Sequence, residues 1–397
     1  MNTHLSLLPT LVLAIVSTCF AESPQLVPIK IEISTAFHGT ATWDWWQVRT
    51  AYVPGPQPNW ITTMSETGKT GTHNFHDIYQ SVSSDAGKSW SSPEPIPSLK
   101  RTKMNDGYEI APGDLWPAWH AKSGKVLTTG KTFNYANGTK EDFLRENVSY
   151  SVMDPATNRW GPMRFLKMPE KDHTGMPILA PNAGCNQRYD LPNGDILLPV
   201  RYQRDPDKRI YVSTVVRCKL DGETLTYIEH GSEHSVLTGR GLYEPSLIKH
   251  GDRYFFTLRN DKTAYVTSSA DGFYFATIQE WAFDDGKSLE SYNTQQHWVT
   301  INDGLFLIYT RRGAENDHIM RHRAPLFIAQ VDPRKLQVIR NTEQVLIPEN
   351  HATLGNSGVC KISNDEIWVT CGEGLVSHGK RKGEKNRVII AKVRSAD

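Results

Sequence analysis

The sequence predicts an all-β protein, a six-bladed β-propeller of four-stranded antiparallel blades, on three observations. Patterns of apolar strand, turn and apolar strand recur from residue 26 to the end of the 397-residue chain. They form two interleaved series whose turns alternate, so that two hairpins make one four-stranded blade. Strong helical periodicity is absent, and the turns carry hairpin signals such as Asn-Gly and Asn-Asp-Gly. The alternative is a β-sandwich with an appended domain.

The chain begins with an apolar segment, residues 5–16, followed by small residues before Ala21. This pattern predicts a secretory signal peptide over residues 1–21, because the apolar run is too short to be a good transmembrane span. Cleavage after Ala21 is favoured over a lipoprotein linkage at Cys19, since VSTC is a poor lipobox. We therefore expect a secreted or periplasmic protein with a single propeller domain over residues 26–397 and no association with membranes.

The outer hairpins are marked by a turn motif that is clearest in SSDAGKSW, residues 83–90. Asp85 can accept hydrogen bonds from backbone amides ahead of it, and Gly87 permits a positive φ. Trp90 can fold back against the strands that the turn joins. Degenerate copies, at successive spacings of 69, 67, 50 and 61 residues, follow at Asp154, Asp221, Asp271 and Asp332. We interpret these turns as scaffold that braces the outer edge of each blade.

A second series of hairpins lies between these copies. Its turns centre on Gly124, Gly194, Gly251, Gly304 and Asp365. An earlier member is predicted from WWQVRTAYV through PGPQPN to WITTM. A final strand over residues 386–394 would complete the last blade, which gives about six blades in total.

Aligning these hairpins on their turns places a cation at the same position of four blades, about seven or eight residues after the turn. The four are Lys131, Arg201, Arg259 and Arg311. If these strands are the inner ones, the cations converge on the mouth of the central funnel, where arginines suit bidentate recognition of a carboxylate. Taken singly, each Arg could instead be a solvated strand end. The formal net charge of only +1 argues against a nucleic-acid partner bound through the overall field.

Three side chains stand about seven residues before the same turns, across from the arginines: Gln187, Glu244 and His297. His120 enters its own blade a little closer to the turn. Glu244 beside Arg259 could be a surface ion pair worth less than about 1 kcal/mol, or at a concave site a charge that tunes a neighbour's pKa. Further acid–base candidates are His73, His76, Asp77, Tyr189, Tyr202 and Tyr243. Aromatic side chains that can stack on sugar faces are Trp43, Trp45, Trp46, Trp116 and Trp119.

No metal-ligand, nucleotide-binding or serine-nucleophile motif is present, so no metal or cofactor is predicted. Scattered histidines in loops could still assemble a site: His173, His318 and His322. Four cysteines remain after the predicted cleavage: Cys185, Cys218, Cys360 and Cys371. A Cys360–Cys371 disulfide and buried free thiols both stay open, because a two-residue turn would make these two thiols diagonal neighbours on one face.

The motifs resemble those of the sialidase superfamily of Asp-box β-propellers. The resemblance rests on SSDAGKSW, on its degenerate copies and on EPSLIKHGDRYFFTLRN. It implies that Glu244 supports the nucleophile and that Arg259 belongs to a carboxylate-binding triad. It also implies Arg311 as a partner in the triad and Asp77 as an acid near the first Asp-box.

Two departures from that family bear on the chemistry. Its Phe/Tyr-Arg-Ile-Pro motif is missing, and Arg49 in QVRTAYV is the nearest candidate for the Arg. Its catalytic Tyr should fall near LGNSGVCKI, where Asn356 and Ser357 stand instead. Neither side chain can replace a phenolate nucleophile.

We therefore expect a monomeric exo-glycosidase that hydrolyses a terminal acidic sugar from an oligosaccharide or polysaccharide. Arg201, Arg259 and Arg311 would bind the sugar's carboxylate, and Glu244 would act with His120 or Asp77 in proton transfer. Gln187, His297 and Tyr202 complete the expected substrate contacts. Two alternatives stay open. One is a uronate lyase that uses a set such as His120, Tyr189, Arg201 and Tyr202, in which His or Tyr removes the C5 proton. The other is an inactive glycan-binding propeller.

Overall fold

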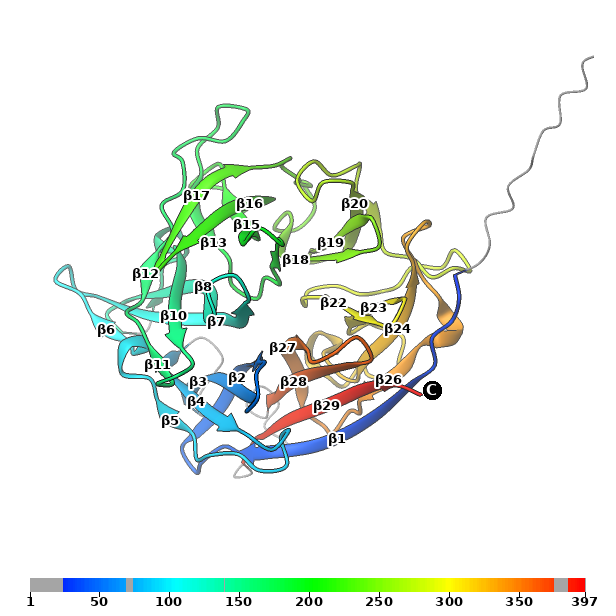
Figure 1. The fold of residues 1–397 in the computed structure, drawn as a ribbon. Helices are drawn as coiled ribbons and strands as arrows, with labels where there is room; N and C mark the ends of the chain where they lie inside the picture. Colours follow the sequence, from blue (N-terminus) through cyan, green and yellow to red (C-terminus); the bar gives the residue numbers. More distant parts are fainter. Residues whose placement is uncertain (1–23, 69–73, 139, 375–384, 397) are drawn as a thin grey trace, which may run out of the picture.

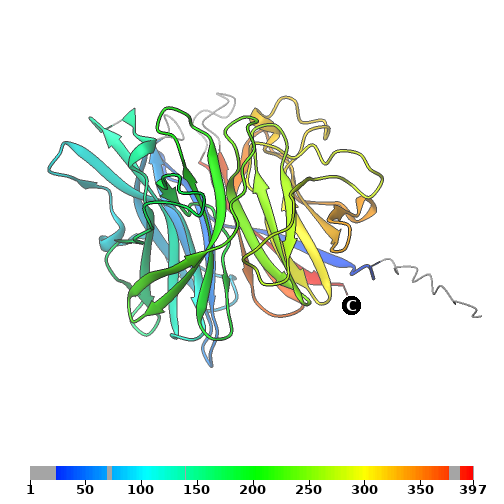
Figure 2. The same ribbon diagram turned by 90° about the horizontal axis from the view of Figure 1, so that it is seen from above.

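The computed structural model describes residues 24–68, 74–138, 140–374 and 385–396. Six antiparallel sheets surround a central axis as the blades of a β-propeller (Figure 1), which confirms the predicted fold. Seen at right angles, the strands run between two opposite faces (Figure 2). The predicted signal peptide lies outside the described residues. No described helix has the length and apolar character needed to cross a bilayer.

The first three blades follow the chain from the axis outward. Blade 1 consists of β2 (Trp43–Val53), β3 (Asn59–Gly68), β4 (Phe75–Ser83) and β5 (Glu94–Pro95). Blade 2 consists of β7 (Tyr108–His120), β8 (Lys125–Ala136), β10 (Val148–Asp154) and β11 (Arg159–Trp160), with β6 (Thr102–Lys103), β9 (Lys140–Glu141) and β12 (Arg164–Phe165) paired at its edges. Blade 3 consists of β13 (Leu179–Asn182), β14 (Tyr189–Asp190), β15 (Asp195–Gln203), β16 (Tyr211–Asp221) and β17 (Thr224–His230).

The remaining blades repeat this plan. Blade 4 consists of β18 (Tyr243–His250), β19 (Arg253–Arg259), β20 (Tyr265–Ser269) and β21 (Gln279–Glu280). Blade 5 consists of β22 (His297–Ile301), β23 (Gly304–Tyr309), β24 (Leu326–Asp332), β25 (Gln337–Val338) and β26 (Gln344–Ile347). Blade 6 consists of β27 (Thr353–Lys361), β28 (Glu366–Gly374), β29 (Arg387–Ser395) and β1 (Ile29–His38). Four 3-10 turns complete the described elements: η1 (Pro97–Leu99), η2 (Phe143–Arg145), η3 (Met320–His322) and η4 (Arg340–Thr342).

The N-terminal strand closes the ring. β1 pairs antiparallel with β29 along its length, from Ile29 opposite Ser395 to His38 opposite Arg387. The predicted strand over residues 386–394 is therefore the third strand of blade 6, and the fourth comes from the other end of the chain. This pairing joins both ends of the described chain in one sheet, so the inner strands around the axis are held in a closed circle.

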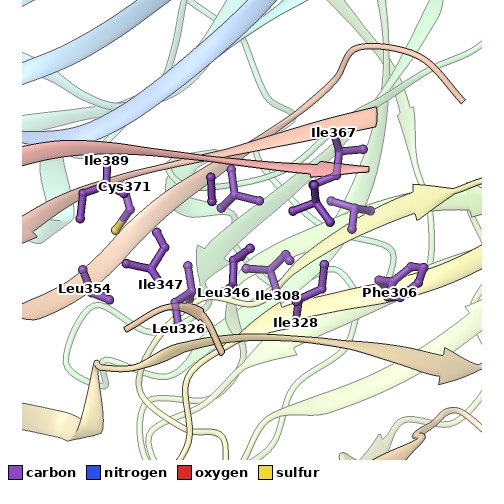
Figure 3. Close-up of a cluster of buried hydrophobic side chains, with 14 of the residues drawn as sticks. Phe306, Ile308, Leu326, Ile328, Leu346, Ile347, Leu354, Ile367, Cys371 and Ile389 are labelled. Carbon is purple, nitrogen blue, oxygen red and sulfur yellow. The ribbon is translucent and has the colours of Figure 1, made fainter. Parts of the chain in front are cut away.

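Apolar faces pack between neighbouring blades and form the core. Figure 3 shows one such cluster between blades 5 and 6. Leu326 and Ile328 of β24 meet Ile367 and Ile389 of blade 6 there, and all four are almost fully buried. Each such side chain contributes about 1.5–3 kcal/mol when it leaves water. Burial of these side chains holds neighbouring blades together and so fixes the positions of the inner strands.

The outer turns have the geometry that their sequence predicts. The Asp85 carboxylate accepts hydrogen bonds from the Ser89 amide at 2.9 Å and from the Ser83 hydroxyl at 2.8 Å. Gly87 has a φ of 73°, and a Cβ there would lie 2.8 Å from the Trp368 ring. Carboxylates of the degenerate copies accept from following amides in the same way at Asp154, Asp271 and Asp332.

None of the four described cysteines forms a disulfide, and all four are buried. The β27–β28 register places Cys360 opposite Trp368 and Val359 opposite Val369. Because neighbouring residues of a strand point to opposite faces, Cys360 packs with Trp368 while Cys371 packs on the other face with Val369. The disulfide alternative was therefore wrong, since it assumed that Cys360 pairs with Val369.

Candidate active site

The inner strands share an irregularity near one end of the central channel. Their pairing shifts register in β2, β7, β18 and β27. Near these register shifts, and at the corresponding position of blade 3, five blades have a non-glycine residue with a positive φ between 45° and 64°. The five residues are Gln47, Asp114, Cys185, Glu244 and Asn356. A β-bulge re-aims a side chain, and strained backbone of this kind is held only where the surroundings fix it. Repetition of the bulge therefore brings these five side chains near one another at one end of the inner strands, which we call the mouth.

Several of the bulge side chains contact one another. Gln47 Oε1 accepts hydrogen bonds from the Ser65 hydroxyl at 2.6 Å and from the Asp114 amide at 2.7 Å. The Cys185 thiol donates to Asp114 Oδ1 at 2.9 Å, and Asn356 Nδ2 lies 3.5 Å from the same oxygen. Asp114 thus lies at the centre of a polar layer contributed by blades 1, 2, 3 and 6.

The predicted pair of Glu244 and Arg259 is formed on blade 4. Arg259 donates from Nη1 to Glu244 Oε2 and, at 2.8 Å, from Nη2 to Asn293 Oδ1. Its guanidinium also lies over the Tyr243 ring, 4.6 Å from the ring centre. Burial alone would raise the pKa of Glu244, but the positive charge of Arg259 outweighs it and holds that pKa below its ordinary range. Glu244 is therefore ionised at neutral pH.

Arg201 and Lys131, also predicted for this mouth, share one buried carboxylate. Glu146, whose side chain is fully buried, lies 2.5 Å from Arg201 Nη2 and 3.0 Å from Lys131 Nζ. Asn182 donates a further hydrogen bond to it at 3.1 Å. Burial raises the pKa of Glu146, yet the charges of Arg201 and Lys131 outweigh that effect and hold it below its ordinary range.

A fifth cation, Arg323, joins the mouth from the segment that follows η3. Its side chain is buried, and burial together with the positive charge of Arg259 lowers its pKa to about 10, against the opposing effect of Glu244. The nearby Arg321 adds to the repulsion. The Nε atom of Arg323 has no hydrogen-bond partner among the described residues. The Glu244 carboxylate thus faces two buried guanidinium groups, those of Arg259 and Arg323.

Arg49 is buried deeper in the channel, against blade 2. Its guanidinium lies over Trp116, 5.1 Å from the ring centre, and Nη1 donates to the Leu115 carbonyl at 3.3 Å. Two of its nitrogens, Nε and Nη2, are buried without a partner among the described residues. Burial and the charge of Asp114 raise the pKa of Cys185, while Arg49 opposes them, so this thiol is protonated at neutral pH.

Arg311 lies apart from Lys131, Arg201, Arg259 and Arg323. It forms a bidentate ion pair with Glu343 at 2.6 and 2.9 Å and packs over Phe327. The paired part of β23 ends at Tyr309, so Arg311 follows the strand and turns outward, whereas Arg259 ends β19 within the sheet. Arg311 is thus paired with Glu343, and Arg323 is the arginine that lies near Arg259 and Glu244.

The two predicted proton-transfer partners of Glu244 are not brought to it. His120 is the last residue of β7, at the turn end, where its ring bonds to the Ser123 hydroxyl at 2.8 Å and the Gly194 carbonyl at 2.9 Å. Asp77 lies on β4, the third strand of blade 1, and accepts from the Arg101 amide at 2.9 Å. The hydrogen bonds of both side chains thus go to other partners, and their catalytic roles stay predictions from the sequence.

Two of the predicted substrate contacts fill the channel itself. Gln187 exchanges two hydrogen bonds of 2.9 Å with the backbone of Trp298 on blade 5. His297 packs edge-on against Trp116, with ring centres 4.7 Å apart, and bonds to the Ser246 hydroxyl. Burial lowers the pKa of His297 well below its ordinary value, so the ring is neutral.

The third, Tyr202, donates to Asp172 at 2.8 Å, on the opposite side of β15 from Arg201. All three side chains are buried or half-buried in these contacts, and their hydrogen bonds hold neighbouring segments together. We assign them to the support of the site.

No family model matches the chain, and no curated protein does. Solved structures do match. A protein of unknown function from Dyadobacter fermentans has a TM-score of 0.62 at 14% identity, covering 92% of this chain and 99% of its own. Trypanosoma rangeli sialidase has the same TM-score and identity over 88% of this chain and 55% of its own. The Hadza microbial sialidase Hz136 has a TM-score of 0.61 at 11% identity, covering 88% of this chain and 66% of its own.

The likeness is to sialidase-like propellers at the level of the fold. This chain spans about half the length of the Trypanosoma rangeli enzyme. At these identities the relationship is distant, and the side chains at the mouth have to be judged on their own chemistry.

Proposed function

We propose that the protein is an exo-glycosidase that hydrolyses a terminal acidic sugar from a glycan, and that its mouth binds the sugar's carboxylate. One observation carries the proposal. Arg259 and Arg323 are both buried beside the carboxylate of Glu244, and burial together with the positive charge of Arg259 lowers the pKa of Arg323. Buried like charges are costly unless an opposite charge joins them, and a carboxylate is a bidentate partner for guanidinium.

The comparisons support an acidic sugar as that ligand. One of the similar structures is a Trypanosoma rangeli sialidase in complex with sialic acid. Another is the same enzyme with 2,3-difluorosialic acid as a covalent intermediate. These ligands belong to those proteins, and the transfer to this chain is our inference. We also propose that the protein is exported, on the strength of the apolar N-terminal segment.

Glycoside hydrolysis needs an acid for the leaving oxygen and negative charge near the oxocarbenium-like transition state. We assign the acid to Asp114, which a bulge aims into the mouth and which the Cys185 thiol orients. Ionised Glu244, which is paired with Arg259, supplies the negative charge. Asp114 first takes up a proton from solvent and gives it to the leaving oxygen; water then adds to the anomeric carbon, and the proton that this water releases returns to Asp114. This scheme requires no tyrosine at Asn356.

The lyase alternative is less well supported by the geometry. Tyr189 pairs with Leu197 toward the turn end of blade 3, and His120 also lies at a turn end. Tyr243 does lie beside Arg259, but burial raises its pKa to about 12, which makes it a weak base at neutral pH. The base expected for C5-proton removal is therefore not assembled beside the cations.

The test is mass spectrometry of products from a panel of sialylated and uronate-containing glycans. The proposal predicts release of an acidic monosaccharide that has gained one water. An unsaturated product without that water would contradict it in favour of a lyase. Retention of a glycan with no product from any substrate would contradict it in favour of a binding protein. Asp114→Asn serves as the matched control, because it keeps the side-chain shape but removes the acid.

A further inference from the structure

A second group of ionisable side chains lies on blade 3, outside the mouth. It consists of His173, His230 and Glu233. His230 ends β17 at the outside of the blade (Figure 1), and Glu233 follows three residues later. His173 lies in a hairpin closed by the bridge between Lys171 and Pro177. Two segments far apart in the sequence therefore meet here.

The donor atoms converge closely. Glu233 Oε1 lies 3.1 Å from His230 Nε2 and 3.5 Å from His173 Nδ1. One ligand atom from each of the three residues lies within 4.8 Å of the other two. The imidazole rings are stacked, with centres 4.0 Å apart and planes 9° apart. Two imidazoles and one carboxylate are the donor set that Zn²⁺ accepts when a fourth position is left to water.

A neighbouring side chain orients the buried ring. The Tyr227 hydroxyl lies 2.7 Å from His230 Nδ1, on the side of the ring away from Glu233. When Nδ1 carries the proton and donates it to this oxygen, Nε2 presents its lone pair toward Glu233. Metal-binding histidines are commonly held by such a bond to their second nitrogen.

We propose that His173, His230 and Glu233 bind a zinc ion. The nitrogen lone pairs of two stacked rings lie in separate parallel planes and cannot both point at one ion, so binding requires the His173 ring to turn until its Nδ1 faces the ion. That turn is open to it, because the His173 side chain is 50% exposed, whereas the His230 side chain is 3% exposed and fixed. The ion then ties the hairpin at residues 171–177 to the end of β17.

Hydrogen bonds connect the hairpin that carries His173 to the strand that carries Arg201. Asp172, next to His173, accepts hydrogen bonds from Tyr202 at 2.8 Å and from Arg204 at 2.6 Å. Tyr202 is the chain neighbour of Arg201. Zinc therefore stabilises the wall of blade 3 that carries Arg201. The site itself rests only on its own residues and does not depend on the proposed glycosidase activity.

The test is zinc binding by the full-length chain after removal of metals with EDTA. Calorimetric titration with Zn²⁺ is expected to show one equivalent bound, and Co²⁺ to give the visible spectrum of a four-coordinate N/O site. His173→Ala, an exposed change that leaves the fold intact, should weaken zinc binding by at least about tenfold. Tyr227→Phe should weaken it by about 10–100-fold through the lost orienting bond.

The chain supplies its own control in His318, Glu349 and His351, a more exposed group with the same donor types. His351→Ala should leave the bound equivalent unchanged. The proposal is overturned if the wild-type protein binds no zinc at micromolar concentration or if His173→Ala binds it as tightly as the wild type. It is equally overturned if His351→Ala, rather than His173→Ala, removes the equivalent.

Discussion

Replacing Arg323 with methionine should lower activity and raise stability at the same time. The pKa of Arg323, about 10, reflects burial and repulsion from Arg259, which cost the folded state on the order of 3 kcal/mol. Methionine keeps the volume and removes the charge, so thermal unfolding should shift upward by a few degrees. Loss of a charge-assisted contact to substrate of about 1.5–3 kcal/mol should reduce kcat/KM by roughly 10–150-fold.

Two measurements on the same variant test this reasoning: calorimetric unfolding and hydrolysis of an acidic-sugar glycoside. Arg311→Met is the matched control, because Arg311 is bonded to Glu343 away from the mouth. It should retain kcat/KM and lose about 1–3 kcal/mol of stability. If Arg323→Met is less stable than the wild type and equally active, Arg323 is a structural residue and the assignment fails.

Three further predictions concern other residues. Asp114→Asn should reduce kcat by about 10²–10⁴-fold with little change in the dissociation constant of the product sugar, as measured by turnover and calorimetry; full activity would remove Asp114 as the acid. The lowered pKa of Glu146 gives stability that is present above its unfolded pKa of about 4.3 and is lost as pH falls through the lower folded pKa. Urea unfolding should therefore show that Glu146→Gln is several kcal/mol less stable at pH 7, with a flatter pH dependence below pH 4; parallel pH curves would contradict it. His120→Ala should leave kcat/KM within about twofold while lowering the melting temperature, because two buried hydrogen bonds are lost; a large loss of kcat alone would return His120 to the site.

The propeller could be predicted from the sequence because its signals are local. Alternating strands and turns that contain Asp and Gly, such as Asp85 and Gly87, depend on residues only a few positions apart. The fourth strand of blade 6 was not foreseen, since the pairing of β1 with β29 joins the two ends of the chain. Glu244 and Arg259 were predicted correctly as neighbours because they belong to one hairpin, where the turn sets the register.

The rest of the mouth depends on features that a residue count cannot show. Counting from the turn assumed a regular strand, but β23 ends at Tyr309, and Arg311 therefore leaves the sheet. The direction of the Asp114 side chain is set by a bulge in which Asp114 has a positive φ. The neighbouring residues in the sequence do not predict this bulge. Arg323 reaches the mouth from a loop in which the sequence indicates only His318 and His322 as candidate ligands. These positions result from packing between blades, so no local pattern encodes them.

The most direct test of the central claim compares two aryl glycosides of one acidic sugar, one with a free carboxylate and one with the carboxylate converted to its neutral amide. Both have the same ring, linkage and leaving group, so only recognition of charge differs. Recognition by Arg259 and Arg323 predicts that kcat/KM for the amide is lower by at least about 100-fold, and that Arg323→Met narrows this ratio. Equal hydrolysis of the two glycosides would contradict the account, because the buried guanidinium groups would then have no part in choosing the substrate.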